Sequence, residues 1–163
     1  ERRSVRKYKS EQISDGELEQ ILKAGLCAPS AMNRQPAIII AVQDKGTIAY
    51  MSKLNAQVMG SNGDPFYGAP TVLVVLAEAD NINAVKDGSL VLGNLMNAAS
   101  ALGIGSCWVN RAQEVFASAE GKALLEKCGV QGDYIGVGNC ILGYVKGELP
   151  APAPRKADYI VTV

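Results

Sequence analysis

The sequence contains no histidine. Histidine is the commonest general base near neutral pH, a usual zinc ligand and the partner of serine or cysteine nucleophiles. Its absence therefore argues against the familiar classes of hydrolase and zinc enzyme. We expect instead that a bound cofactor carries the chemistry and that the protein positions it.

Paired cysteines and nucleotide-binding glycine motifs are also missing. The four cysteines form no CxxC pair and lie in apolar surroundings, which predicts buried, reduced thiols: Cys27, Cys107, Cys128 and Cys140. Two short glycine patterns, at 103–105 and 136–138, lack the strand-then-helix context of a dinucleotide fingerprint, and no GK[ST] motif occurs. Classical nucleotide-binding folds are thus disfavoured.

No excess of charge and no long apolar run is present. Lysine plus arginine equals aspartate plus glutamate at 16 each, so no net charge attracts nucleic acid or a membrane surface. No stretch approaches the roughly 20 apolar residues of a membrane-spanning helix, and no targeting segment is visible. We therefore expect a cytoplasmic protein that binds neither nucleic acid nor membrane, and 163 residues suit one domain.

Apolar periodicity and capping residues predict an α+β chain. Ser14–Glu17 reads as a capping box that opens a helix ended near Pro29. Further helices are expected around 48–58, 87–102 and 117–128. Strands are expected at 37–42 (buried, closed by a turn at 44–46), 71–77 (central), 107–109 and 134–145. Three prolines then impose an extended path, and the β-prone residues 159–163 suit addition to a sheet edge, its own or a partner's.

Both ends of the chain carry clustered cations. Arg2, Arg3 and Arg6 surround Ser4, and Arg155-Lys156 follows the proline run. Arginines with a hydroxyl are suited to a phosphate. The alternatives are a frayed, solvated basic terminus and a solvated surface pair, and spacing alone does not show that the two ends meet.

Polar residues also fill the loop between the first helix and the first strand. Ser30, Asn33 and Gln35 suit the edge of a polar heteroaromatic ring, although a mere connecting loop is equally compatible with the sequence. Other conspicuous residues receive structural interpretations. The carboxylates Asp87, Glu114 and Asp133 are interpreted as caps or solvated charges, and the aromatics Trp108, Phe66 and Tyr67 as core residues.

Taken in chain order, five segments resemble the nitroreductase family. They are Arg-Arg-Ser-Val-Arg at 2–6, Ala-Pro-Ser with Asn33 and Gln-Pro at 28–36, Tyr-Gly-Ala-Pro at 67–70, the long helix leading to 102–108, and Gly143-Tyr144 followed by prolines and Arg155-Lys156. The resemblance implies one FMN-binding domain over residues 1–163, with 150–163 as an extended C-terminal arm. It also implies a mixed, largely antiparallel sheet between helices, and a homodimer that exchanges its arms.

The resemblance further implies cofactor-binding roles. Phosphate, ribityl chain and pyrimidine edge would be bound by Arg2, Arg3, Ser4 and Arg6, and the phosphate site would be completed by Arg155 and Lys156. The partner subunit would supply Pro29, Ser30 and Asn33 along the isoalloxazine. A backbone N–H near flavin N5 would come from the segment of Val109 and Asn110.

The activity implied is an FMN-dependent oxidoreductase. It would transfer a hydride from NADH or NADPH through flavin N5 to a small flat acceptor of nitroaromatic or quinone type, in a ping-pong cycle. No side chain is expected to be catalytic in its own right, with Arg6 as an electrostatic stabiliser of reduced flavin. Two other interpretations remain: a non-catalytic flavin-binding, storage or flavin-processing relative, and a colourless protein that binds another phosphorylated ligand.

Overall fold

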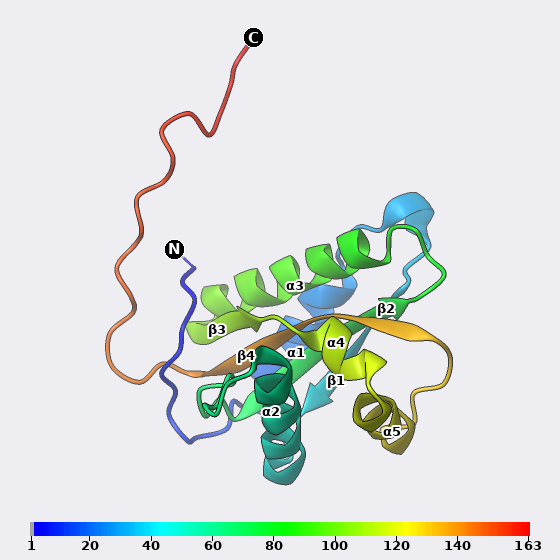
Figure 1. Ribbon diagram of the computed structural model, residues 1–163. Coiled ribbons are helices and arrows are strands. Elements are labelled where there is room, and N and C mark those ends of the chain that lie inside the picture. The colour runs from blue at the N-terminus through cyan, green and yellow to red at the C-terminus, as the bar shows by residue number, and fades with distance from the viewer. Residues whose placement is uncertain (1) are drawn as a thin grey trace.

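A four-stranded sheet forms the centre of the molecule (Figure 1). The computed structural model describes residues 2–163. Each neighbouring pair of strands is antiparallel, and the spatial order is β1-β2-β4-β3. The strands are β1 (Ala37–Val42), β2 (Thr71–Glu78), β3 (Ile104–Val109) and β4 (Tyr134–Tyr144). The predicted α+β class with a largely antiparallel sheet is confirmed.

Helices cover both faces of this sheet (Figure 1). The helices are α1 (Asp15–Leu26), the short 3-10 turn η1 (Ala31–Asn33), α2 (Lys45–Met59), α3 (Ala84–Ala101), α4 (Ala112–Ala117) and α5 (Ala119–Lys127). One face of the sheet packs against α1 and α3, and the other face packs against α2, α4 and α5. None of the helices within residues 2–163 is long and apolar enough to cross a membrane.

The second strand shows why two cores form. Val72 and Val74 face the core beneath α2, whereas Leu73 and Val75 face α1 and α3. Alternate side chains of a strand point to opposite faces, so a strand covered on both sides is apolar throughout. The prediction of a central strand at 71–77 is thus confirmed.

Two predicted elements differ from the structure near the first strand. β1 is an edge strand and is only partly buried, not the buried strand that its apolar run indicated. The expected turn at 44–46 is the start of α2, because Asp44 caps this helix with an Oδ2 that accepts from the Thr47 N–H at 2.7 Å. That bond, with a second from the Thr47 hydroxyl, holds the pKa of Asp44 below its usual value.

The predicted helix at 117–128 corresponds to α5, and a short helix that was not predicted, α4, precedes it. Ser118 is extended (φ −72°, ψ 161°) and separates α4 from α5, and its Oγ accepts from the Gly121 N–H at 3.0 Å. Two other predicted elements are of the expected type but begin earlier than predicted. α3 begins at Ala84 and not at Asp87, and β3 begins at Ile104 and not at Cys107.

The cysteines are not uniformly buried as predicted. Cys107 and Cys140 are buried, and burial raises the pKa of Cys140 to about 12. Cys27 and Cys128 are exposed because each caps the C-terminal end of a helix, where the chain turns into solvent. All four are free thiols.

Candidate cofactor-binding site

The N-terminal segment is anchored and is not the frayed terminus that composition alone allowed. The Val5 N–H donates to the Ser106 carbonyl of β3 at 2.9 Å, and Tyr8 forms a bridge with Val145. Val5 is 3% exposed and Tyr8 8%. Since alternate residues of an extended segment point in opposite directions, anchoring Val5 directs its neighbours Ser4 and Arg6 away from that core.

Two unsatisfied polar atoms lie where this segment meets β3. The Arg2 side chain is half-buried, and its Nη1 is buried with no hydrogen-bond partner within residues 2–163. Ser106 Oγ is likewise buried and has no partner there. Buried polar groups are almost always paired, so an unpaired guanidinium nitrogen indicates a missing anionic or acceptor group.

The Arg6 side chain is held by an aromatic ring. Its guanidinium carbon lies 5.9 Å from the centre of the Tyr67 ring, a cation–π contact. Tyr67 is 44% exposed, so it is not the core residue predicted, although its neighbour Phe66 is fully buried. The Arg6 cation is thus positioned by its contact with Tyr67.

The N-terminal segment runs beside the base of the C-terminal arm. The Lys146 N–H donates to the Lys7 carbonyl at 3.0 Å and the Lys9 N–H to the Tyr144 carbonyl at 2.9 Å. A groove of about 340 Å³ lies between these segments, lined by Ser4, Val5, Arg6, Lys7, Val145, Lys146, Glu148 and Pro150. The structure therefore brings the base of the C-terminal arm to Ser4 and Arg6, two of the predicted cofactor-binding residues.

Beyond this groove the arm leaves the body of the protein (Figure 1). Residues 146–163 are exposed, and no strand forms among them. Arg155 and Lys156 lie on this exposed stretch, so the single chain does not place them against Arg2 and Arg3. The predicted β-prone tip at 159–163 joins no sheet within residues 2–163.

Pro29, Ser30 and Asn33 lie in the turn between α1 and β1. Ser30 Oγ accepts from the Gln35 N–H at 2.9 Å, and Asn33 Oδ1 accepts from Gln35 Nε2 at 3.0 Å. The turn is also tied to α3, because both carboxylate oxygens of Asp87 accept from the Ala31 N–H at 3.2 and 3.3 Å. Asp87 is 5% exposed, so its interpretation as a cap or solvated charge is wrong.

Val109 and Asn110 mark the end of β3. Val109 is buried, and its carbonyl accepts from the side chain of Asn139 at 3.5 Å. Asn110 is exposed, and Arg111 adopts a left-handed conformation (φ 77°) that starts α4. Arg111 pairs with Glu114 at 2.9 Å, and this hydrogen-bonded contact lowers the pKa of Glu114. The junction thus has a fixed, sharply bent backbone.

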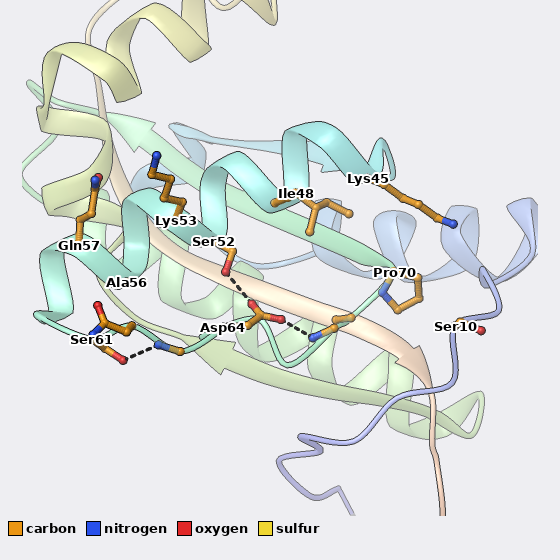
Figure 2. A pocket seen from close by; sticks show the side chains of 15 residues that line it. Ser10, Lys45, Ile48, Ser52, Lys53, Ala56, Gln57, Ser61, Asp64 and Pro70 are labelled. Carbon is orange, nitrogen blue, oxygen red and sulfur yellow. Dashed lines mark hydrogen bonds between the residues drawn. The ribbon is translucent and has the colours of Figure 1, made fainter.

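A larger cavity lies along α2, and sequence reasoning did not identify it (Figure 2). It measures about 740 Å³, and its wall includes Lys45, Lys53 and the loop residues Asn62, Asp64 and Gly68. Figure 2 shows Ser52 and Asp64 pointing toward one another, joined by a hydrogen bond of 2.6 Å. None of the predicted cofactor-binding residues lines this cavity.

The Asp64 carboxylate at this cavity is fully engaged. Besides Ser52 Oγ it accepts from the backbone N–H groups of Phe66 (2.9 Å) and Gly68 (2.6 Å). It therefore shapes the loop that carries Tyr67. Within residues 2–163 no group of three or more histidine, cysteine, aspartate or glutamate side chains could hold a metal ion.

The comparisons with known proteins agree with these features. A sequence model described as the nitroreductase family matches residues 1–144. The chain belongs to the nitroreductase family. A relative from Archaeoglobus fulgidus, provisionally named NADH dehydrogenase/NAD(P)H nitroreductase, is 36% identical over 153 residues, covering 90% of this chain and 83% of the relative.

Solved nitroreductases share the fold as a whole. A nitroreductase with bound FMN from Bacteroides fragilis superposes with a TM-score of 0.91 at 30% identity, covering 99% of this chain and 94% of its own. A second FMN-bound nitroreductase, from Desulfitobacterium hafniense, has a TM-score of 0.88 at 28% identity, with coverage of 100% and 94%. The family resemblance read from the sequence is confirmed.

Proposed function

We propose that this nitroreductase-family chain is an FMN-dependent oxidoreductase. It transfers a hydride from NADH or NADPH to a small flat acceptor of nitroaromatic or quinone type, in a ping-pong cycle. The observation that carries the proposal is the buried, unpaired Nη1 of Arg2 within an anchored cationic segment. Relatives of the same fold hold FMN, whose phosphate is the kind of group this nitrogen lacks.

The residues present fit a phosphate at the N-terminal segment. Arg2, Arg3 and the Ser4 hydroxyl would bind it, each charge-assisted hydrogen bond contributing about 1.5–3 kcal/mol. Arg155 and Lys156 would complete this site once the arm is ordered. The groove shared by the N-terminal segment and the base of the arm supports this proposal, because the arm starts beside Ser4.

Bound FMN would supply the redox chemistry, accepting and returning a hydride at N5. Arg6, held over Tyr67, would place a cation where negative charge develops in the pyrimidine ring. The bent backbone at Val109 and Asn110 would present an N–H group to N5. These residues bind and orient, and no side chain is assigned as a proton-transferring group.

We further propose a homodimer in which each subunit completes the other's site. Pro29, Ser30 and Asn33 of one subunit would pack along the flavin of its partner. Large apolar side chains are exposed on and near this turn, which supports a covered surface: Leu26 (76%), Met32 (82%), Ile82 (91%), Val85 (50%) and Leu90 (47%). The exposed apolar arm tip would be exchanged between subunits.

The absorption spectrum of the purified protein tests the proposed function. We expect a yellow protein whose flavin band bleaches anaerobically with NADH or NADPH and returns when a nitroaromatic or quinone is added. A yellow protein that neither nicotinamide bleaches contradicts the oxidoreductase and supports a flavin-binding or storage role. Failure to quench the fluorescence of added FMN contradicts the cofactor itself.

A further inference from the structure

The turn between α1 and β1 has a costly backbone conformation. Met32 (φ 56°), Asn33 (φ 54°) and Gln35 (φ 50°) all lie in the left-handed region, although none is glycine. This region is unfavourable for a residue with a side chain, because its Cβ approaches the following carbonyl oxygen. Three such residues within four positions require contacts that hold the turn, and stored strain of this kind is concentrated at functional sites.

Contacts within the turn are exposed and therefore weak. The bonds from Gln35 to Ser30 and Asn33 involve solvent-accessible groups. Exposed hydrogen bonds contribute little net stability, because water competes for the same groups. These bonds define the shape of the turn but leave its position relative to the body of the protein unspecified.

Asp87 supplies the buried contact from outside the turn. It stands in the first turn of α3, and its two oxygens share the Ala31 N–H. Asp87 and Ser30 also line a small cavity of about 100 Å³ beside Pro36, which is large enough for water. The position of the turn is thus set by α3, the long helix packed on the sheet.

Both oxygens of the Asp87 carboxylate face the Ala31 N–H group, at 3.2 and 3.3 Å. Either oxygen alone is an acceptor for this N–H, so the contact depends on an acceptor at this position of α3. A contact that holds a turn against a rigid helix is what a binding surface requires.

We infer that Asp87 is a positioning residue for the flavin. Through the Ala31 N–H it fixes the turn that presents Ser30 and Asn33 to the cofactor of the partner subunit. This inference rests on the proposed function, which places the turn at the flavin. Asp87 itself touches neither cofactor nor substrate.

The experiment compares three full-length variants. Asp87→Ala removes the acceptor, and Asp87→Asn keeps a carbonyl oxygen of the same reach. Asn94→Ala is the matched control, because Asn94 also stands on α3 and donates to a backbone carbonyl outside the turn, that of Ala24, at 3.0 Å. FMN affinity is measured on flavin-free protein by fluorescence quenching. Trypsin cleavage after exposed Arg34, in the turn, is measured without flavin.

We expect Asp87→Ala to weaken FMN binding at least fivefold and to speed cleavage at Arg34 at least fivefold. Asp87→Asn should stay within twofold of the unmodified chain in both measurements, and so should Asn94→Ala. An unchanged cleavage rate in Asp87→Ala overturns the inference that Asp87 fixes the turn. Faster cleavage with unchanged FMN affinity shows that Asp87 fixes the turn but that the turn does not contact the flavin, which overturns the inference.

Two further outcomes of this experiment distinguish a failure of the proposed function from a failure of the role of Asp87. If the unmodified chain binds no FMN, the proposed function fails, while the cleavage rate at Arg34 still tests whether Asp87 fixes the turn. If Asp87→Ala does not fold, Asp87→Ser replaces it, since a serine hydroxyl is too short to span the same distance. The expectations for Asp87→Ser are those for Asp87→Ala.

Discussion

Arg2 and Arg3 are the residues on which the proposed phosphate site depends. Arg2 Nη1 is buried and unpaired, and the Arg2 cation opposes the burial-driven rise in the pKa of Cys140, so Arg2 lies close to the sheet. We predict that replacing both arginines with alanine weakens FMN binding at least tenfold, since one lost charge-assisted hydrogen bond already amounts to about 1.5–3 kcal/mol. Quenching of FMN fluorescence by the flavin-free protein measures this.

Lys122 and Lys127 provide the control for this double substitution. Both are exposed on α5, far along the chain from the N-terminal segment. Changing both to alanine removes the same net charge, so FMN affinity should stay within twofold. An equal loss of FMN affinity in the two double variants would show that the arginines act only through the overall charge of the protein.

Single residues differ in how well the sequence predicts them. The arginine cluster and the Ser14–Glu17 capping box are local patterns, and both form ordered features of the structure. Asp87 was missed because its contact spans 56 positions, from Ala31 to α3. Nothing in the sequence around a helical carboxylate shows that a distant turn will bury it.

At the scale of elements, the capping box of α1 also joins the sheet. Glu17 Oε2 accepts from the Ser14 N–H (2.8 Å), the Ser14 hydroxyl (2.7 Å) and the Tyr144 hydroxyl at the end of β4 (2.6 Å). The Ser14 hydroxyl, then Tyr144, lowers the pKa of Glu17. A lowered folded-state pKa means that this contribution is present above the ordinary glutamate pKa of about 4.3 and is lost as the pH falls below it.

Glu17→Gln should therefore destabilise the protein in a pH-dependent way. At pH 7 we predict a loss of roughly 0.5–1 kcal/mol in the free energy of unfolding, typical of a weakened cap. Near pH 3.5 the two proteins should differ by less, because Glu17 of the unfolded chain is then largely protonated. Urea unfolding at both pH values measures this, and a difference that stays constant with pH would show that the charge is not involved.

The break between α4 and α5 depends on a glycine. A Cβ added to Gly121 would lie 2.0 Å from the Val115 carbonyl oxygen, whereas one added to Gly16 in α1 would meet no atom within 4 Å. We predict that Gly121→Ala lowers the free energy of unfolding by more than about 1 kcal/mol through overpacking. Gly16→Ala should raise it by roughly 0.5–1 kcal/mol, because alanine is the better helix former. Thermal or urea unfolding of the two variants should shift in opposite directions.

Element boundaries were harder to predict than element types. The short helix α4 at 112–117 was not predicted, and the extended backbone of Ser118 separates it from α5. Asp44-Lys45-Gly46 has the composition of a turn, yet Asp44 can equally cap a helix, and the following residues decide between the two. Local sequence fixes the periodicity, while packing decides where each helix begins.

At the scale of the whole molecule, the two edges of the sheet are unlike. The β3 edge is covered by the N-terminal segment through the Ser4–Ser106 bridge. The β1 edge has no neighbouring strand within residues 2–163, although Ala37–Val42 is apolar. An open apolar edge readily accepts another strand, and natural proteins usually cover it. Sequence alone indicated that the arm would join a sheet edge, and the topology makes β1 the available one.

The arm tip is the segment suited to that edge in a second copy. Tyr159, Ile160, Val161 and Val163 are all at least 80% exposed in the single chain. Burying such a side chain contributes about 1.5–3 kcal/mol, so burial of only two of these four would already strengthen a dimer at least 100-fold. We predict that the full chain sediments at twice 17.2 kDa, whereas a chain ending at Lys156 dissociates at least 100-fold more readily and binds FMN more weakly while keeping both phosphate cations. Asp158→Ala, in the same segment, should leave the dimer intact. Equal dimer stability with and without residues 157–163 would contradict the prediction that the arm tip is buried in the dimer.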